Sequence, residues 1–180
     1  MKATLRRVRT AIAVDPSKDR VYGARGINDI CVELVTLPVD FTRRQNFGRY
    51  GRVILEKMFH SPKEGTPGDP NVLIDLTAAG YWVACQCDGP LEVYTPANWK
   101  AQRKKPIHHR ALWEGVFTDS ERDLFEEREP DLYDYIVAAC KRYAKTGKVT
   151  GYDRMITNHL DAAGLLATAT GRCRIGGGAI

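Results

Sequence analysis

The stretch Ile30-Cys31-Val32-Glu33-Leu34-Val35-Thr36-Leu37, followed by Pro38, predicts a β-strand. It is rich in β-branched residues and ends at a residue that cannot donate a ladder hydrogen bond. On either side of it, residues 4–14, 72–76, 81–87 and 91–94 predict further strands, separated by turn signals such as Asp88-Gly89-Pro90. Residues 50–60 predict a helix, because their apolar side chains recur at helical spacing. We therefore expect small antiparallel sheets in the first two thirds of the chain.

After residue 117 the sequence is typical of helices. Asp119 or Ser120 is suited to cap a first helix, and Pro130 suits the first turn of a second helix that runs to about residue 144. We expect a third helix from about residue 151 to 163 and a strand at 165–170. The predicted fold class is α+β, with small antiparallel sheets and a C-terminal three-helix subdomain. The expected segments are 1–65, 66–117 and 118–180.

Composition limits the class of protein. The 180 residues are 43% hydrophobic and 27% charged, which is ordinary for a globular protein. No apolar run approaches the ~18 residues of a membrane span. The apolar stretch 11–14 is too short for a signal peptide, and the five cysteines form no secreted disulfide framework, so we expect a cytoplasmic protein. Motifs of phosphate-binding loops, dinucleotide-binding folds and zinc proteases are absent from the sequence.

The positive charge is concentrated in the first part of the chain. Residues 1–110 hold 18 Lys and Arg against 11 Asp and Glu, whereas residues 111–150 hold 6 against 9. Cations neutralise phosphates and an aromatic ring stacks on unpaired bases, so basic residues interleaved with an aromatic favour nucleic-acid binding. The candidates are Arg43, Arg44, Arg49, Arg52, Trp99, Lys100, Arg103, Lys104, Lys105 and Arg110. The alternative is a solvated basic loop with Trp99 packed into the core.

Cysteine and histidine residues suggest a metal site. Cys85 and Cys87 are spaced so that both can reach one ion, and His108 and His109 follow at the distance of a loop. Structural zinc binds four such ligands in a tetrahedron. His60 and Glu114 are further candidates for the fourth position. The alternative is two cysteines in a strand and an exposed histidine pair.

The segment Trp82-x-Ala84-Cys85-x-Cys87, with Pro90-Leu91 and His108-His109 after it, resembles a segment of uncharacterised proteins of bacterial integrative and conjugative elements. The resemblance covers about thirty residues and implies a structural zinc ion. The family pattern places a cysteine shortly after the histidine, but here Arg110-Ala111-Leu112-Trp113-Glu114 follows.

The C-terminal helices also resemble part of a winged helix. The stretch 155–166, which ends in Leu-x-x-x-Gly-Leu, is similar to a recognition helix, and Thr170-Gly171-Arg172 would form the wing tip. That resemblance implies that Thr157, Asn158 and His159 face a DNA groove. The alternative is a helical subdomain that binds protein.

We therefore expect a non-catalytic accessory protein of a phage or mobile element that binds nucleic acid or a nucleoprotein complex. A protein-binding inhibitor of a host defence system is the alternative, with an acidic surface formed by Glu121, Glu126, Glu127 and Glu129. An enzyme is a further alternative, through a Cys85–His108 pair or a nuclease site at Asp75 and Glu92 with a nearby lysine. The sequence specifies neither the partner, nor a sequence preference, nor the oligomeric state.

Overall fold

A computed structural model describes residues 9–17, 19–57, 70–100, 103–152 and 154–173. The strands are β1 (Thr10–Pro16), β2 (Arg20–Ile27), β3 (Ile30–Pro38), β4 (Val53–Glu56) and β5 (Leu91–Tyr94). The helices are α1 (Pro70–Cys85), α2 (Pro96–Trp99), α3 (Lys105–Gly115), α4 (Asp119–Arg128), α5 (Leu132–Thr146) and α6 (Met155–Ala169), and a 3₁₀ turn, η1, spans Phe47–Arg49.

One five-stranded mixed sheet organises the fold. Its strand order is β3-β2-β1-β4-β5. β1, β2 and β3 pair antiparallel, whereas β4 runs parallel to both β1 and β5. The α+β class is therefore confirmed, but the small antiparallel sheets are replaced by one mixed sheet that takes strands from residues 10–56 and from residues 91–94.

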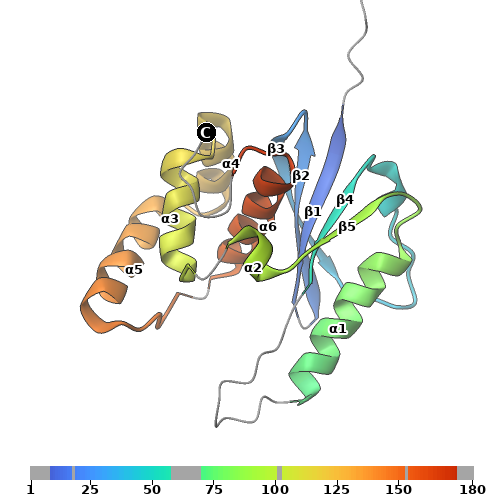
Figure 1. Ribbon diagram of the computed structural model, residues 1–180, viewed down its shortest axis with the longest axis horizontal. Helices are drawn as coiled ribbons and strands as arrows, with labels where there is room; N and C mark the ends of the chain where they lie inside the picture. The colour runs from blue at the N-terminus through green and yellow to red at the C-terminus, as the bar shows by residue number, and fades with distance from the viewer. Residues whose placement is uncertain (1–8, 18, 58–69, 101–102, 153, 174–180) are drawn as a thin grey trace, which may run out of the picture.

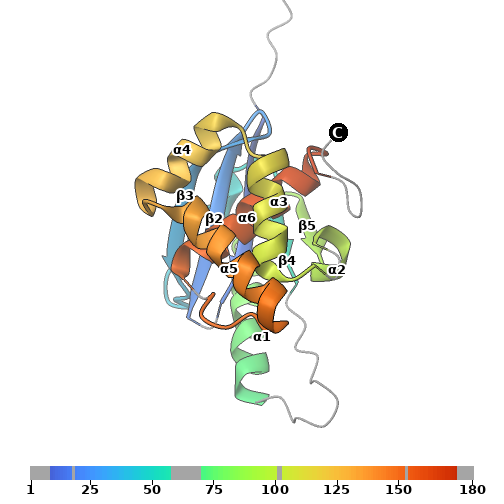
Figure 2. The ribbon, with the colours of Figure 1, turned by 90° about the vertical axis from the view of Figure 1, so that its left-hand side faces the viewer.

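Helices cover both faces of the sheet. α1 lies on one face, and α6 lies on the other, with α3, α4 and α5 packed outside it (Figure 1). Figure 2 shows α3, α4 and α5 in front of the sheet. Two hydrophobic clusters correspond to the two faces, because side chains alternate along each strand. Ala13, Ala24 and Ile54 face α6, while Ile12, Val14 and Leu55 belong to the cluster with Trp82 of α1.

Small residues bring α6 close to its neighbours. A Cβ at Gly26 of β2 would lie 2.9 Å from Leu166 Cδ2, and one at Gly164 would lie 2.5 Å from Leu112 Cδ1. Both distances are shorter than side chains tolerate, so the missing Cβ atoms let β2 and α3 approach α6. The approach buries α6 almost completely between the sheet and the outer helices.

Several expected elements are confirmed and several are wrong. The strands at 30–37 and 91–94 and the helices expected from about residues 119, 130 and 151 are present, although the last two begin at Leu132 and Met155. The expected strands at 72–76 and 81–87 are one helix, α1, whose buried residues Ala79, Trp82 and Val83 are spaced by three and four. The expected helix at 50–60 is also wrong, because residues 53–56 form β4 and η1 ends just before residue 50. Residues 58–60 lie outside the described part.

The expected strand at 165–170 is also wrong, because α6 continues to Ala169. Gly164 does not end the helix, since its place is against Leu112 and Trp99 in the helix interior. No wing strand follows α6 in the described residues up to 173. Thr157 and His159 are buried and Asn158 is half-buried, so α6 is not an exposed recognition helix.

Among the helices of the described ranges, none combines the length and the apolar character of a membrane span.

Candidate active site

Three carboxylates from three elements converge at one edge of the sheet. Asp15 lies near the end of β1 and Glu56 is the last residue of β4. Val14 is in register with Leu55 in the parallel pair, so the next residue of each strand is carried to the same edge. Asp161 comes from α6, which packs across β1 and β4. The three residues are 6%, 2% and 1% exposed, respectively.

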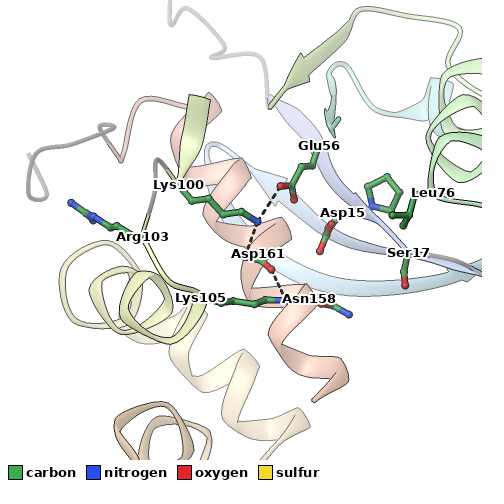
Figure 3. Close-up of a pocket in the computed structure, with 10 residues that line it drawn as sticks. Asp15, Ser17, Glu56, Leu76, Lys100, Arg103, Lys105, Asn158 and Asp161 are labelled. Atoms are coloured by element: carbon green, nitrogen blue, oxygen red, sulfur yellow. Dashed lines mark hydrogen bonds and ion pairs between the residues drawn. The ribbon is translucent and has the colours of Figure 1, made fainter. Parts of the chain in front are cut away.

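The three carboxylates line an open cavity of about 210 Å³ (Figure 3). Asp15 and Glu56 point toward Asp161 from the sheet side, and Lys100 and Lys105 reach in from the opposite wall. The full lining is Asp15, Pro16, Ser17, Glu56, Leu76, Lys100, Arg103, Lys105, Asn158 and Asp161.

Two ammonium groups contact the carboxylates. Lys100 Nζ lies 3.1 Å from Glu56 Oε1 and 3.7 Å from Asp161 Oδ1. Glu56 Oε1 is buried, and the Lys100 ammonium is its only polar contact within the described residues. Lys105 Nζ lies 2.8 Å from Asp161 Oδ2 and donates to Asn158 Oδ1 at 2.9 Å. The Asp15 carboxylate receives no hydrogen bond or ion pair from the described residues.

The electrostatics of the two aspartates differ. Burial raises the pKa of Asp15 well above its usual value, and the charges of Glu56 and Asp161 raise it further. Burial alone would also raise the pKa of Asp161, but His109, Lys100 and Lys105 hold it far below its usual value. Asp161 is therefore ionised at neutral pH, whereas the ionisation of Asp15 is disfavoured.

Lys100 stays charged in this setting. Burial alone would lower its pKa, but the negative charges of Asp161, Glu56 and Asp15 raise it above the ordinary value. The ammonium also lies 4.7 Å from the centre of the Trp99 ring.

A buried histidine fixes Asp161 from behind. His109 Nε2 lies 3.0 Å from Asp161 Oδ1, and His109 Nδ1 lies 2.8 Å from the Tyr152 hydroxyl oxygen. Burial lowers the pKa of His109, so the ring is neutral. A carboxylate only accepts, so Nε2–H donates to Asp161 and Nδ1 accepts from Tyr152. This arrangement orients the Asp161 carboxylate toward the cavity.

The structure does not bring the expected zinc ligands together. Cys85 is exposed and Cys87 is half-buried, near the end of α1, and the Cys87 thiol donates to the Val83 carbonyl. His108 and His109 are buried in α3, on the other face of the sheet (Figure 1). The expected strand that would have presented the cysteines is a helix, which explains the separation. His60 lies outside the described residues, and Glu114 pairs with Arg110 on the surface.

The expected nucleic-acid residues divide into two groups. Lys100, Arg103 and Lys105 line the cavity, and Lys104 is exposed between the last two. Trp99 is 1% exposed and packs against His108, so it belongs to the core and does not stack on bases. The remaining arginines lie elsewhere and mostly contact acids: Arg43 with Asp40, Arg44 with Asp88, Arg52 with Glu92, Arg110 with Glu114, and Arg49 over the Tyr50 ring.

The acidic surface is smaller than expected. Glu121 is 1% exposed and therefore not part of a surface. Its side chain accepts from the Thr118 backbone N–H at the start of α4 and pairs with Arg172. Glu129 pairs with Arg154, whereas Glu126 and Glu127 are exposed. The residues of the expected nuclease site are also separated. Glu92 lies on β5 and contacts Arg52, whereas Asp75 lies on α1.

The sequence reasoning missed Asp15, Glu56 and Asp161. One signal was present: an acid follows each of two short, wholly apolar strand segments, Ala11–Val14 and Val53–Leu55. Recognising it required reading residues 53–56 as a strand.

Comparisons with known proteins find similarity at the level of the fold only. No family model matches the chain, and no curated protein matches its sequence. Among solved structures, the chain is similar to T. thermophilus RuvC in complex with Holliday junction substrate, with a TM-score of 0.44 and 10% identity over 90% of this chain and 96% of that one. A Thermus thermophilus RuvC structure gives a TM-score of 0.35 at 10% identity, covering 77% and 96%. Neither likeness assigns a residue or an activity to this chain. The expected origin in a phage or mobile element stays a prediction.

Proposed function

We propose that this protein hydrolyses phosphodiester bonds in nucleic acid, using divalent cations held by Asp15, Glu56 and Asp161. The observation that carries the proposal is the convergence of three buried carboxylates on one open cavity. Like charges held together and desolvated cost stability, and the raised pKa of Asp15 is a sign of that cost. Strongly shifted pKa values in a cleft are characteristic of functional sites.

The residues fit a hard divalent cation. Mg²⁺ prefers carboxylate oxygens and keeps several of its waters, so it needs few protein ligands and space beside them. Within the described residues Asp15 has no ion pair or hydrogen bond, and the only polar contact of the buried Glu56 Oε1 is the Lys100 ammonium. In the described part of the chain no three acidic, histidine or cysteine side chains stand close enough to enclose an ion as they are placed. The ammonium groups of Lys100 and Lys105 lie among the carboxylates instead.

Each residue has a role in such a site. Cations bound here would polarise the phosphate and activate the attacking water. Asp15 and Glu56 would hold them from the sheet, which is the rigid part of the fold, and Asp161 from α6. His109 keeps the Asp161 carboxylate oriented, as described above. Lys105 and Arg103 at the wall of the cavity supply positive charge for the phosphates on either side of the reacting one.

Nucleic acid is the substrate class that the charge favours. The chain carries a formal net charge of +5, and within the cavity lining three cations balance the three carboxylates. A polyanion is attracted to the net positive charge of the chain, and its binding weakens as salt rises. The cavity opens to solvent, as a polymer substrate requires.

The test is a cleavage assay with end-labelled DNA. Single strands, duplexes and a four-way junction would be incubated with Mg²⁺, Mn²⁺ or EDTA; the junction is included because RuvC was solved with such a substrate. We expect cleavage that needs a divalent cation and is lost in Glu56→Gln and Asp161→Asn. Asp123→Asn, at an exposed acid of α4, should cut like the wild type. Cleavage in EDTA, or equal cleavage by Glu56→Gln, would contradict the proposal.

Binding without hydrolysis is the second candidate. It is favoured by one observation: Lys100 and Lys105 already neutralise two of the three carboxylates. In that case the protein should bind DNA equally in Mg²⁺ and EDTA and cut none of the substrates with either cation.

A further inference from the structure

Lys100 has an unusual position for a surface cation. It follows α2 directly, and its side chain is 22% exposed, while the side chains of its partners Glu56 and Asp161 are almost fully buried. Its ammonium therefore lies inside the carboxylate cluster and not at the rim. The Trp99 ring, 4.7 Å from Nζ, forms the wall behind it.

The contacts of Lys100 are those that a cation between Glu56 and Asp161 would make. The ammonium lies 3.1 Å from one carboxylate and 3.7 Å from the other. Lys105 differs, because it contacts only Asp161 of the three acids and donates its hydrogen bond to Asn158. Lys100 is thus the cation that contacts both Glu56 of the sheet and Asp161 of α6.

We propose that Lys100 is a built-in competitor of the divalent cation: its ammonium neutralises Glu56 and Asp161 in the cation-free protein and is displaced when a divalent cation binds them. The inference rests on the proposed function, since it concerns the same site. Two physical effects follow. The fold tolerates its buried carboxylates without a metal ion, because an internal charge pairs with them. The affinity for the metal ion is reduced, because binding must break these contacts and overcome the repulsion of a nearby positive charge.

The test measures metal binding directly and does not depend on activity. Wild type and Lys100→Met would be stripped with EDTA and titrated with Mn²⁺ by calorimetry, with melting temperatures recorded with and without Mn²⁺. Lys104→Met is the matched control, because Lys104 is exposed, lies outside the cavity lining and loses the same charge.

We expect Lys100→Met to bind Mn²⁺ about tenfold more tightly than the wild type or more, since a positive charge about 4 Å from the ion is removed. Without metal it should melt lower than the wild type, and Mn²⁺ should raise its melting temperature further than it raises that of the wild type. Lys104→Met should match the wild type in both respects. If Lys100→Met does not fold, Lys100→Gln removes the same charge and keeps a hydrogen-bond donor, and the same comparison applies.

The outcomes separate the two proposals. Equal or weaker Mn²⁺ binding by Lys100→Met, in a wild type that binds Mn²⁺ and cuts DNA, overturns the inference and leaves the function standing. An equal gain in Lys104→Met also overturns it, because the effect would then be one of overall charge. Tight binding by Lys100→Met without DNA cleavage by any form keeps the inference and overturns hydrolysis. If no form binds Mn²⁺, both fail.

Discussion

His109 Nε2 lies 3.0 Å from Asp161 Oδ1, and both residues are buried to within 1% of full burial. The neighbouring His108 is equally buried but makes no side-chain hydrogen bond within the described residues. The two adjacent histidines of α3 therefore have different structural roles. His109 joins α3 to α6 at the candidate active site, and His108 fills space beside Trp99.

The first prediction compares these two histidines. His109→Phe removes the hydrogen bond to Asp161 Oδ1, leaving this carboxylate with its lysine contacts only, and it leaves the Tyr152 hydroxyl without its acceptor. It should therefore lower the free energy of unfolding by about 3 kcal/mol. His108→Phe removes a polar group that has no partner, and should cost less than about 1 kcal/mol. Urea unfolding measures both values. A larger loss for His108→Phe than for His109→Phe would contradict the assignment.

The second prediction concerns pH. Burial, with the neighbouring His109, lowers the pKa of His108 to about 3. The folded state therefore disfavours protonation that the unfolded chain accepts near pH 6.5. The stability associated with the neutral ring is present above pH 6.5 and is lost as pH falls from there toward 3. Stability curves of His108→Phe should be flatter than those of the wild type over this range, and curves of equal slope would show that His108 titrates normally.

The third prediction concerns the Glu121–Arg172 pair. Glu121 accepts hydrogen bonds from both Arg172 nitrogens, at 2.8 and 2.6 Å, and from the Cys31 backbone N–H. Glu121→Gln leaves the charge of Arg172 largely buried and uncompensated, and should cost about 3 kcal/mol of unfolding free energy. Glu126→Gln, at an exposed position of the same helix, should change it by less than about 0.5 kcal/mol. Chemical denaturation measures the unfolding free energy of both variants. Equal losses for Glu121→Gln and Glu126→Gln would mean that Glu121 is solvated.

The fourth prediction uses two helical glycines. A Cβ at Gly164 would lie 2.5 Å from Leu112 Cδ1 and 3.0 Å from the Trp99 ring, whereas one at Gly80 of α1 meets nothing within 4 Å. Gly164→Ala should therefore destabilise the fold by about 1–3 kcal/mol. Gly80→Ala should stabilise it by about 0.5–1 kcal/mol, since alanine favours a helix. Thermal unfolding should shift in opposite directions, and a shift in the same direction would contradict the packing around Gly164.

The sequence predicted the elements whose signals are local. The strand at 30–37 has a β-branched composition, and α4 has an acidic first turn. The cap of α4 is Thr118, one residue before the expected Asp119 or Ser120. α1 was missed because it is apolar over most of its length, so its buried residues do not stand out by spacing. β4 has four residues, all buried, and a short apolar run of this kind does not distinguish a strand from a helix.

The candidate active site was missed for a different reason. Asp15 looks like the first residue of a turn when only its neighbours are considered. Its proximity to Glu56 depends on the parallel pairing of β1 with β4, and its proximity to Asp161 on the packing of α6 over both. Such contacts join positions 41 to 146 residues apart, and no local pattern reports them. The cations Lys100, Arg103 and Lys105 were found, because they are adjacent in sequence.

The most direct test of the account is the DNA cleavage rate of Asp15→Asn in Mg²⁺. The substitution keeps the shape of the side chain and removes a charge that burial and its neighbours disfavour, so the variant should fold at least as stably as the wild type. We predict that it binds DNA as the wild type does and cuts it at least about 100-fold more slowly, because the substitution removes a cation ligand at the reacting phosphate. Cleavage within about twofold of the wild type would contradict the central claim that Asp15, Glu56 and Asp161 form a hydrolytic site.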